Sequence, residues 1–154
     1  MDSPSANLST IVVVDDEPAA LEFCRYALIR AGYNVYAASS GEEALMYFRP
    51  NRSPVDLALV DVVMPGMSGV ELVQRLEKLN PNTRIVLMSG YSPLEVQRIL
   101  GKDTACYRSM WKPFEAATLT QMVNNVLNTP TEIRAHQKRS NCGGVTGGRK
   151  VEAG

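Results

Sequence analysis

The chain has little of the side-chain chemistry that holds disulfide-rich or zinc-binding proteins together. Its 154 residues include three cysteines and one histidine. Cys24, Cys106 and Cys142 are odd in number and too far apart for a Cys-x-x-Cys pair, and His136 is the one histidine that could join them as a ligand. This pattern fits neither a disulfide framework nor a zinc site.

An excess of one charge and a long apolar run are also missing. Lys and Arg together number 16, as do Asp and Glu, so the formal net charge is zero and no basic field favours nucleic acid or anionic lipid. No apolar run approaches the roughly 20 residues that span a bilayer, and residues 1–10 lack the basic and apolar segments of a secretory signal. We therefore expect a cytoplasmic protein that binds neither nucleic acid nor membranes.

What the sequence does contain is the composition of a folded globular domain, with 45% hydrophobic and 21% charged residues. The length suffices for one domain of ordinary size. The last residues differ, because glycine is frequent between residues 143 and 148 and basic residues outnumber acidic ones. We predict an N-terminal extension over 1–9, one domain over 10–128, and a disordered, Gly-rich basic tail over 129–154.

Within this domain, short apolar runs alternate with segments of helical period, which is typical of a parallel sheet covered by helices. The runs that predict strands are residues 11–14, 34–38, 57–60, 84–88 and 107–111. Five helix starts are expected. Three are marked by a serine with a Glu three residues later, at Ser40, Ser68 and Ser92, and the other two by Pro18 and Phe114. We expect the second helix to continue through Phe48, and the third to bury Leu72, Val73, Leu76 and Leu79.

Polar residues follow four of these strands, at the edge where an open parallel sheet binds its ligands. They are Asp15 and Asp16, then Asp61, Ser89 and Lys112. Carboxylates gathered in one pocket raise one another's pKa unless a cation is bound. Oxygen ligands without His or Cys select a hard ion, and Mg²⁺ fits best.

A carboxylate beside a metal is the arrangement in which an aspartate acts as a nucleophile and forms an aspartyl phosphate. Asp61 is our candidate for this role. Lys112 and Ser89 are the candidates for holding the phosphoryl oxygens, because phosphoryl transfer depends chiefly on positioning and charge neutralisation.

Four motifs together resemble those of the response regulator receiver family. They are Val-Val-Asp-Asp-Glu-Pro at 13–18, Asp-Val-Val-Met-Pro-Gly-Met-Ser-Gly at 61–69, Met-Ser-Gly at 88–90 and Lys-Pro-Phe at 112–114, and the match covers about 10–128. The resemblance implies a flavodoxin-like, doubly wound α/β fold with five helices and five parallel strands in the order 2-1-3-4-5.

The same resemblance assigns roles. Asp61 would be the phosphoacceptor, and Asp15, Asp16, Asp61 and the backbone carbonyl of Val63 would hold Mg²⁺. Ser89 would take the place of the switch Ser or Thr, and Lys112 would precede a cis Lys-Pro bond. The phosphodonor would be a phosphohistidine on a sensor histidine kinase or phosphotransfer protein, in a two-component phosphorelay. Phosphorylation would bias a surface near the fourth helix, fifth strand and fifth helix toward an effector protein or a second copy.

Departures from the family pattern open alternatives. Ser109 stands where receivers carry a switch Phe or Tyr. Tyr107 or Trp111 would substitute for it if the strand register shifted, and only one of the two would then be placed correctly. Val63 and Tyr91 occupy two positions that flank the phosphate, and because neither orients water well, we expect slow hydrolysis of the phospho-aspartate.

Two other functions stay open. A receiver-like scaffold that works without phosphate is encouraged by Ser109. A haloacid-dehalogenase-type phosphatase also uses an aspartate nucleophile with Mg²⁺, but its nucleophile ends the first strand and its acidic pair comes last. Here the acidic pair comes first and the lysine last, so we expect a signalling module rather than an enzyme.

Overall fold

The sheet at the centre of the protein has the strand order expected from the sequence. A computed structural model describes residues 8–50, 54–101, 104 and 107–130. Among these residues, five parallel strands pair in the order β2-β1-β3-β4-β5. Their bounds are β1 Thr10–Val14, β2 Asn34–Ala38, β3 Leu57–Asp61, β4 Arg84–Ser89 and β5 Arg108–Trp111. The flavodoxin-like fold is thus confirmed.

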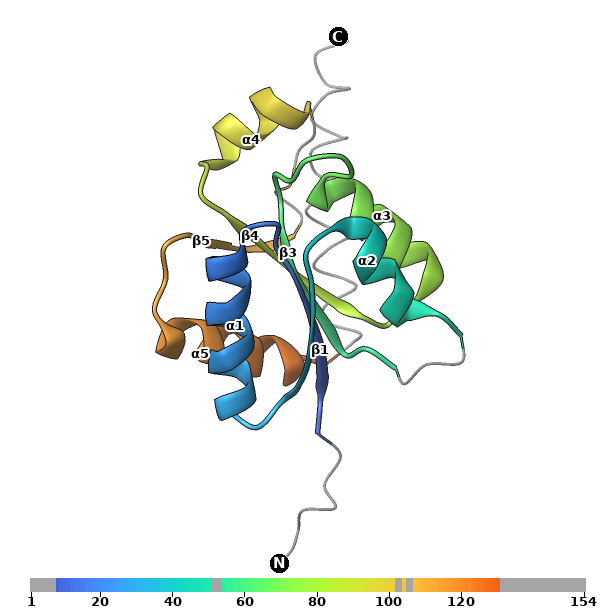
Figure 1. Ribbon diagram of the computed structural model, residues 1–154, viewed down its shortest axis with the longest axis vertical. Coiled ribbons are helices and arrows are strands. Elements are labelled where there is room, and N and C mark those ends of the chain that lie inside the picture. The colour runs from blue at the N-terminus through green and yellow to red at the C-terminus, as the bar shows by residue number, and fades with distance from the viewer. Residues whose placement is uncertain (1–7, 51–53, 102–103, 105–106, 131–154) are drawn as a thin grey trace, which may run out of the picture.

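Helices cover both faces of this sheet, as Figure 1 shows. They are α1 Pro18–Arg30, α2 Gly41–Leu45, α3 Gly69–Leu79, α4 Pro93–Leu100 and α5 Ala116–Leu127, with a short 3₁₀ turn η1 Met46–Phe48 after α2. Helices α1 and α5 pack together on one face, and α2 and α3 lie on the other. This arrangement leaves the carboxyl ends of the strands open at one edge of the sheet.

Helix starts follow the Ser-x-x-Glu signals, with one difference. Complete capping boxes form at Ser68 with Glu71 and at Ser92 with Glu95. At α2, the Ser40 side chain accepts a hydrogen bond from the Glu43 backbone, but the Glu43 carboxylate accepts from Ser39 instead of Ser40. The expected helix through Phe48 ends at Leu45, and the chain continues as a 3₁₀ turn.

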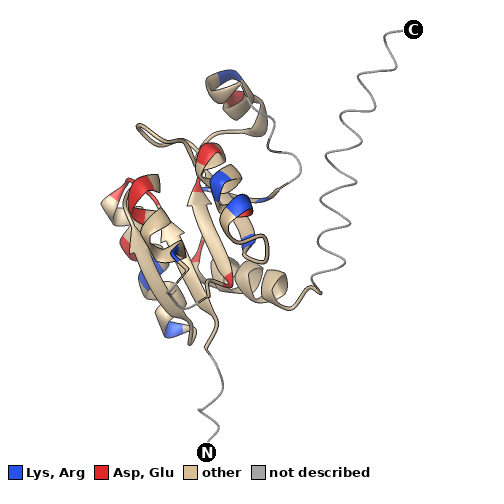
Figure 2. Ribbon diagram, turned by 90° about the vertical axis from the view of Figure 1, so that its right-hand side faces the viewer, with Lys and Arg blue, Asp and Glu red and all other residues tan. Residues whose placement is uncertain are grey.

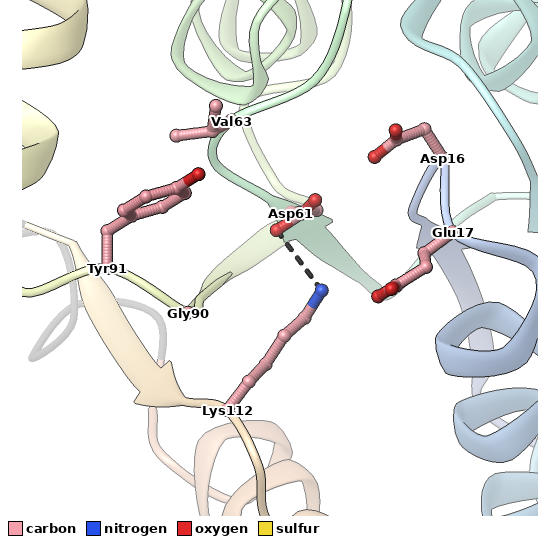
Figure 3. Close-up of a pocket in the computed structure, with 7 residues that line it drawn as sticks. All are labelled: Asp16, Glu17, Asp61, Val63, Gly90, Tyr91 and Lys112. Carbon is pink, nitrogen blue, oxygen red and sulfur yellow. Dashed lines mark ion pairs between the residues drawn. The ribbon is translucent and has the colours of Figure 1, made fainter.

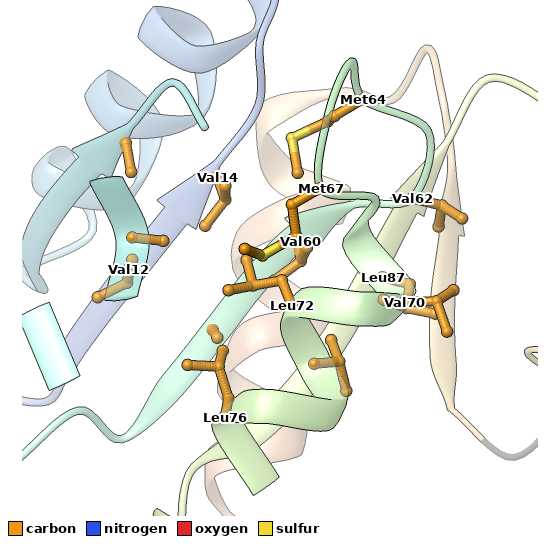
Figure 4. Packing of buried hydrophobic residues seen from close by; sticks show 14 of the residues in the cluster. Val12, Val14, Val60, Val62, Met64, Met67, Val70, Leu72, Leu76 and Leu87 are labelled. Carbon is orange, nitrogen blue, oxygen red and sulfur yellow. The ribbon is translucent and has the colours of Figure 1, made fainter. Parts of the chain in front are cut away.

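Two apolar layers hold the sheet between the helices. Successive residues along each strand point to opposite faces of the sheet. Val12, Val14 and Val60 therefore pack against α2 and α3, whereas Ile11 and Val13 pack against α1 and α5. Figure 4 shows the first of these layers. The central strands β1 and β3 are buried along their whole length, which fixes the position of the residues that follow them.

The ends of two elements differ from the expectation. Leu79 was expected to be buried, but it is 58% exposed because it ends α3, one turn beyond the last buried contact at Leu76. Tyr107 was expected to begin the fifth strand, but its N–H donates to the Thr104 carbonyl in a turn, so β5 begins at Arg108.

Helix α4 stands out from the sheet in both ribbon views (Figures 1 and 2). Val96 is its one buried residue, Leu100 packs partly against the core, and Leu94 and Ile99 are exposed. Within the described part of the chain, no helix is long and apolar enough to cross a bilayer. Of the cysteines, Cys24 is buried in the core, whereas Cys106 and Cys142 lie outside the described residues, as do His136 and the tail beyond residue 130.

Candidate functional site

Three carboxylates meet at the carboxyl edge of the sheet. Strands β1 and β3 are neighbours in register, with Val14 opposite Val60, so Asp15 and Asp61 leave the sheet at the same level. Oxygens of Asp15, Asp16 and Asp61 lie within 4.8 Å of one another. An oxygen-only set of this size suits a hard divalent cation such as Mg²⁺. The structure therefore gathers the acidic residues that the sequence singled out.

Asp15 is the most enclosed of the three. Its residue is fully buried, and both carboxylate oxygens have partners. Oδ1 accepts a hydrogen bond from the Glu17 backbone at 2.9 Å, and Oδ2 accepts one from Lys112 Nζ at 2.6 Å. These contacts fix the position of Lys112 and the start of α1. Asp15 thus forms the buried floor of the site, and Asp16 and Asp61 lie closer to solvent.

Lys112 reaches the carboxylates from the end of β5. Its backbone N–H donates to the Ser89 carbonyl at 2.8 Å, and the peptide bond to Pro113 is cis, as the resemblance implied. Its ammonium lies 2.6 Å from Asp15 and 3.4 Å from Asp61 Oδ1. In this arrangement one cation is shared between two carboxylates, and Figure 3 shows it directed at Asp61.

Charge is unbalanced at Asp61. Burial raises the pKa of Asp61 to about 7, and the charge of Asp15 acts in the same direction, against the lowering effect of Lys112. Burial alone would lower the pKa of Lys112, but its hydrogen bond to Asp15 and the charge of Asp61 hold that pKa above its ordinary value. One ammonium thus does not compensate the carboxylates, and a divalent cation would supply the missing charge.

An open pocket borders Asp61 and Lys112. It is lined by Asp16, Glu17, Asp61, Val63, Gly90, Tyr91 and Lys112 (Figure 3). The Asp16 and Glu17 carboxylates point inward from one side, and the Tyr91 ring covers the opposite side next to Val63. The sequence had singled out Val63 and Tyr91 for their positions, but it gave no role to Glu17, which follows the acidic pair directly.

Ser89 is near the site, but its hydroxyl is turned elsewhere. It is buried, accepts a hydrogen bond from the Tyr91 N–H at 2.9 Å and donates one to the Tyr91 carbonyl at 2.9 Å. Its side chain is not among the residues that line the pocket. A hydroxyl has a single proton to donate, so Ser89 would have to release the Tyr91 carbonyl before it could donate to a phosphoryl oxygen.

Two aromatic residues near Ser109, Tyr107 and Trp111, are candidates to replace the switch Phe or Tyr of the family. Ser109 and Trp111 lie two residues apart on β5 and so share one face, and Tyr107 precedes the strand by one residue, two positions before Ser109. The spacing of Tyr107 and Trp111 from Ser109 is thus even, so neither needs a register shift to lie on its side of the sheet. The Tyr107 hydroxyl donates to Glu77 at 3.2 Å, whereas Trp111 is 54% exposed. Tyr107 is anchored to the end of α3, and Trp111 is the freer of the two.

Buried Cys24 lies beneath the site. Burial raises the pKa of its thiol to about 12, with the charge of Asp15 acting in the same direction. Its sulfur lies 3.9 Å from that of Met88. A thiol with such a pKa stays protonated at neutral pH, and Cys24 acts as a packing residue.

Known proteins share this sequence pattern. Residues 11–124 match the family described as the response regulator receiver domain. Sensor kinase CckA of Brucella abortus (strain 2308) is 35% identical over 119 residues, which are 77% of this chain and 12% of that protein. The alkaline phosphatase synthesis transcriptional regulatory protein PhoP of Bacillus subtilis (strain 168) is 32% identical over 125 residues, 81% of this chain and 50% of that protein. This chain thus spans half or less of the length of these two relatives.

Solved structures share the fold. The response regulator protein TrrA of Thermotoga maritima, in complex with Mg²⁺ and BeF, is 30% identical with a TM-score of 0.64, over 77% of this chain and 99% of that chain. A CheY-like receiver domain protein from Methanospirillum hungatei JF-1 is 28% identical with a TM-score of 0.64, over 87% of this chain and 99% of that chain. The family match over most of the chain, the strand order and these likenesses agree, and the chain belongs to the response regulator receiver domain family of two-component systems.

Proposed function

We propose that this chain is a phosphoacceptor receiver whose Asp61 is phosphorylated with the help of Mg²⁺. The observation that carries the proposal is the meeting of Asp15, Asp16 and Asp61 with Lys112 at the open edge of the sheet. Phosphoryl transfer needs a nucleophile held in place and positive charge around the transferred group. At this edge of the sheet β3 holds Asp61 in place, Lys112 supplies one positive charge, and Mg²⁺ would supply the rest.

The metal would be held by Asp16 and Asp61, which line the pocket, by the buried Asp15 and by the backbone carbonyl of Val63. Bound there, Mg²⁺ would neutralise the carboxylates and the charge that develops on the phosphoryl oxygens. The chain's own residues supply the positioning. Strand β3 fixes Asp61, and Asp15 holds Lys112 at 3.4 Å from Oδ1 of the Asp61 carboxylate.

In the transfer, a carboxylate oxygen of Asp61 forms a bond to phosphorus while the bond from phosphorus to a histidine nitrogen of the donor breaks. The electron pair of the broken bond stays on the imidazole. Lys112 would pair with the new phosphoryl oxygens, and Ser89 would donate to one of them after it leaves the Tyr91 carbonyl. Movement of Ser89 would then release the Tyr91 backbone at the start of α4, which links the chemistry to a surface that partners can read.

The donor would be a sensor histidine kinase or a histidine phosphotransfer protein in the cytoplasm. Of the relatives described above, CckA is named as a sensor kinase and PhoP as a transcriptional regulatory protein. Phosphorylation would favour binding of an effector protein or a second copy through the surface of α4, β5 and α5. The outer side of α4 is suited to this role because Leu94 and Ile99 are exposed there.

Intact mass after incubation with acetyl phosphate tests the proposal. We expect the wild type to gain the mass of one phosphoryl group when Mg²⁺ is present, and no gain with chelator or in Asp61→Asn. Asp56→Asn is the matched control, because Asp56 lies at the opposite end of β3, where its carboxylate accepts from the Thr10 N–H. A wild type that stays unmodified with Mg²⁺, or an Asp61→Asn variant that is modified equally, would contradict the proposal.

A phosphate-independent scaffold is the second candidate, favoured by Ser109 and by the anchoring of Tyr107 to Glu77. It predicts that partner binding is the same in wild type and Asp61→Asn, with and without acetyl phosphate. The phosphatase alternative has less support, since the motif order and the family match both favour a receiver. Catalytic hydrolysis of a generic phosphate ester would favour the phosphatase over the receiver.

We expect the phospho-aspartate to be long-lived, because Val63 and Tyr91 line the pocket and neither orients a water for attack. Val63→Asn introduces an amide at the rim and should shorten the lifetime by about tenfold. Val63→Ala is the matched control: it removes bulk without adding a polar group and should change the lifetime less. Loss of the phosphoryl mass over time measures this, and a wild-type lifetime of seconds would contradict the prediction.

A further inference from the structure

The first residue of α3 lies directly against the backbone of the proposed phosphoacceptor. Gly69 is buried, and its N–H donates to the Val62 carbonyl at 2.8 Å. A Cβ at this position would lie 2.1 Å from the Asp61 carbonyl oxygen and 2.8 Å from the Val62 Cα. Real side chains do not approach backbone atoms so closely, so any residue larger than glycine forces part of the chain to move.

Neither side of this contact can yield easily. On the strand side, β3 lies between β1 and β4, and the Val62 N–H donates to the Met88 carbonyl at 2.9 Å. On the helix side, Leu72 and Leu76 of α3 are fully buried in the apolar layer that Figure 4 shows, and the Ser68–Glu71 capping box fixes the first turn. The displacement would therefore be shared, and part of it would fall on Asp61 and the residues after it.

We propose that Gly69 is a positioning residue for the Asp61 site: its missing side chain lets α3 sit against the Asp61–Val62 peptide, which sets the direction of the Asp61 carboxylate and the Val63 carbonyl. The inference rests on the proposed function, because it concerns the residues that would hold Mg²⁺ and receive the phosphoryl group. Gly69 would act through the backbone of Asp61 and Val62, without contacting the ion or the phosphoryl group itself. The geometry that it controls is the spacing of oxygens within the 4.8 Å cluster.

Another glycine provides a matched comparison. Gly41 is also buried and also begins a helix, α2, but a Cβ there would meet the Met67 side chain, with Sδ at 2.6 Å. A methionine side chain can rotate away, whereas the Asp61 carbonyl cannot leave the strand without moving the residue. Gly41→Ala and Gly69→Ala thus introduce the same methyl group at the same helix position, and only the second acts on the backbone of the site.

The test compares the wild type with these two variants in metal-free and Mg²⁺-containing solution. Metal-free amide chemical shifts of Val62 and Val63 report the backbone, calorimetry gives the Mg²⁺ dissociation constant, and intact mass gives phosphorylation by acetyl phosphate at saturating Mg²⁺. We expect Gly69→Ala to shift both amides and to weaken Mg²⁺ binding at least tenfold while it remains folded. Gly41→Ala should keep the wild-type Mg²⁺ affinity even if its melting temperature falls.

The outcomes are distinguishable. If the wild type binds no Mg²⁺ and accepts no phosphoryl group, the proposed function fails and this inference fails with it. If the wild type does both, and folded Gly69→Ala binds Mg²⁺ with unchanged affinity, only this inference is overturned. Should Gly69→Ala be unfolded in buffer, all three proteins are compared in trimethylamine N-oxide, which favours the compact state. A variant unfolded even there shows that Gly69 serves the fold alone, which also overturns the inference.

Discussion

Replacing Asp61 by asparagine is expected to stabilise the metal-free protein at pH 8. Burial raises the pKa of Asp61 from 3.8 to about 7, so the folded state favours the protonated carboxyl. The stability contributed by that proton is complete below pH 4 and is lost as the pH rises through about 7. The amide that replaces the carboxyl carries no charge at any pH. The variant should therefore gain up to about 4 kcal/mol in the free energy of unfolding at pH 8, and little at pH 4.

Thermal unfolding at several pH values in chelator measures this effect. Mg²⁺ should reverse the order at pH 8, because an ion that binds only the folded wild type stabilises it by mass action and has one ligand fewer in the variant. Asp56→Asn serves as control, since Asp56 lies at the other end of β3. If metal-free Asp61→Asn melts below the wild type at pH 8, the picture of an uncompensated carboxylate at this position is wrong.

Replacing Lys112 by methionine should have the opposite effect. The ammonium lies 2.6 Å from Asp15 Oδ2, and Asp15 is fully buried. Removing one partner of a buried pair leaves the other charge without compensation, which costs about 3–5 kcal/mol. The pKa of Lys112 is raised above its ordinary value, so its stabilising charge is present across the neutral range and the loss should be visible from pH 6 to pH 8.

Urea unfolding with and without Mg²⁺ measures the loss. Mg²⁺ should restore part of the stability of Lys112→Met, because the ion supplies the missing positive charge beside Asp15. Lys78→Met at the exposed end of α3 is the matched control and should change stability by less than about 0.5 kcal/mol. Equal stability of Lys112→Met and the wild type in chelator would show that Asp15 does not depend on this ammonium.

Much of the fold could be predicted because local signals and tertiary packing agree. The uniformly apolar runs ending at Val14 and Val60 form the two central strands, and the boxes at Ser68 and Ser92 begin α3 and α4 as expected. The sequence patterns predicted less well at the ends of helices and strands. Leu79 fits the helical period of α3, but period alone does not show that the last buried residue of this helix is Leu76.

The site was predictable in its residues and less so in its geometry. The convergence of Asp15, Asp16, Asp61 and Lys112 follows from parallel strands that end at one edge, and this rule needs only the order of the strands. The hydrogen bonds of Ser89 to the Tyr91 backbone depend on a hydroxyl rotamer, which the sequence does not encode locally. The contact of Gly69 with Asp61 depends on how closely α3 approaches β3, which the helix-start signal at Ser68 does not report.

The most direct test of the central claim is to locate the phosphoryl group by reduction. Borohydride converts an aspartyl phosphate to homoserine and releases phosphate, so peptide mass spectrometry after acetyl phosphate treatment identifies the modified residue. We predict homoserine at position 61 alone, formed with Mg²⁺ and absent with chelator. Homoserine at Asp15 or Asp16, or its absence from position 61 in a protein that has gained a phosphoryl group, would contradict the account.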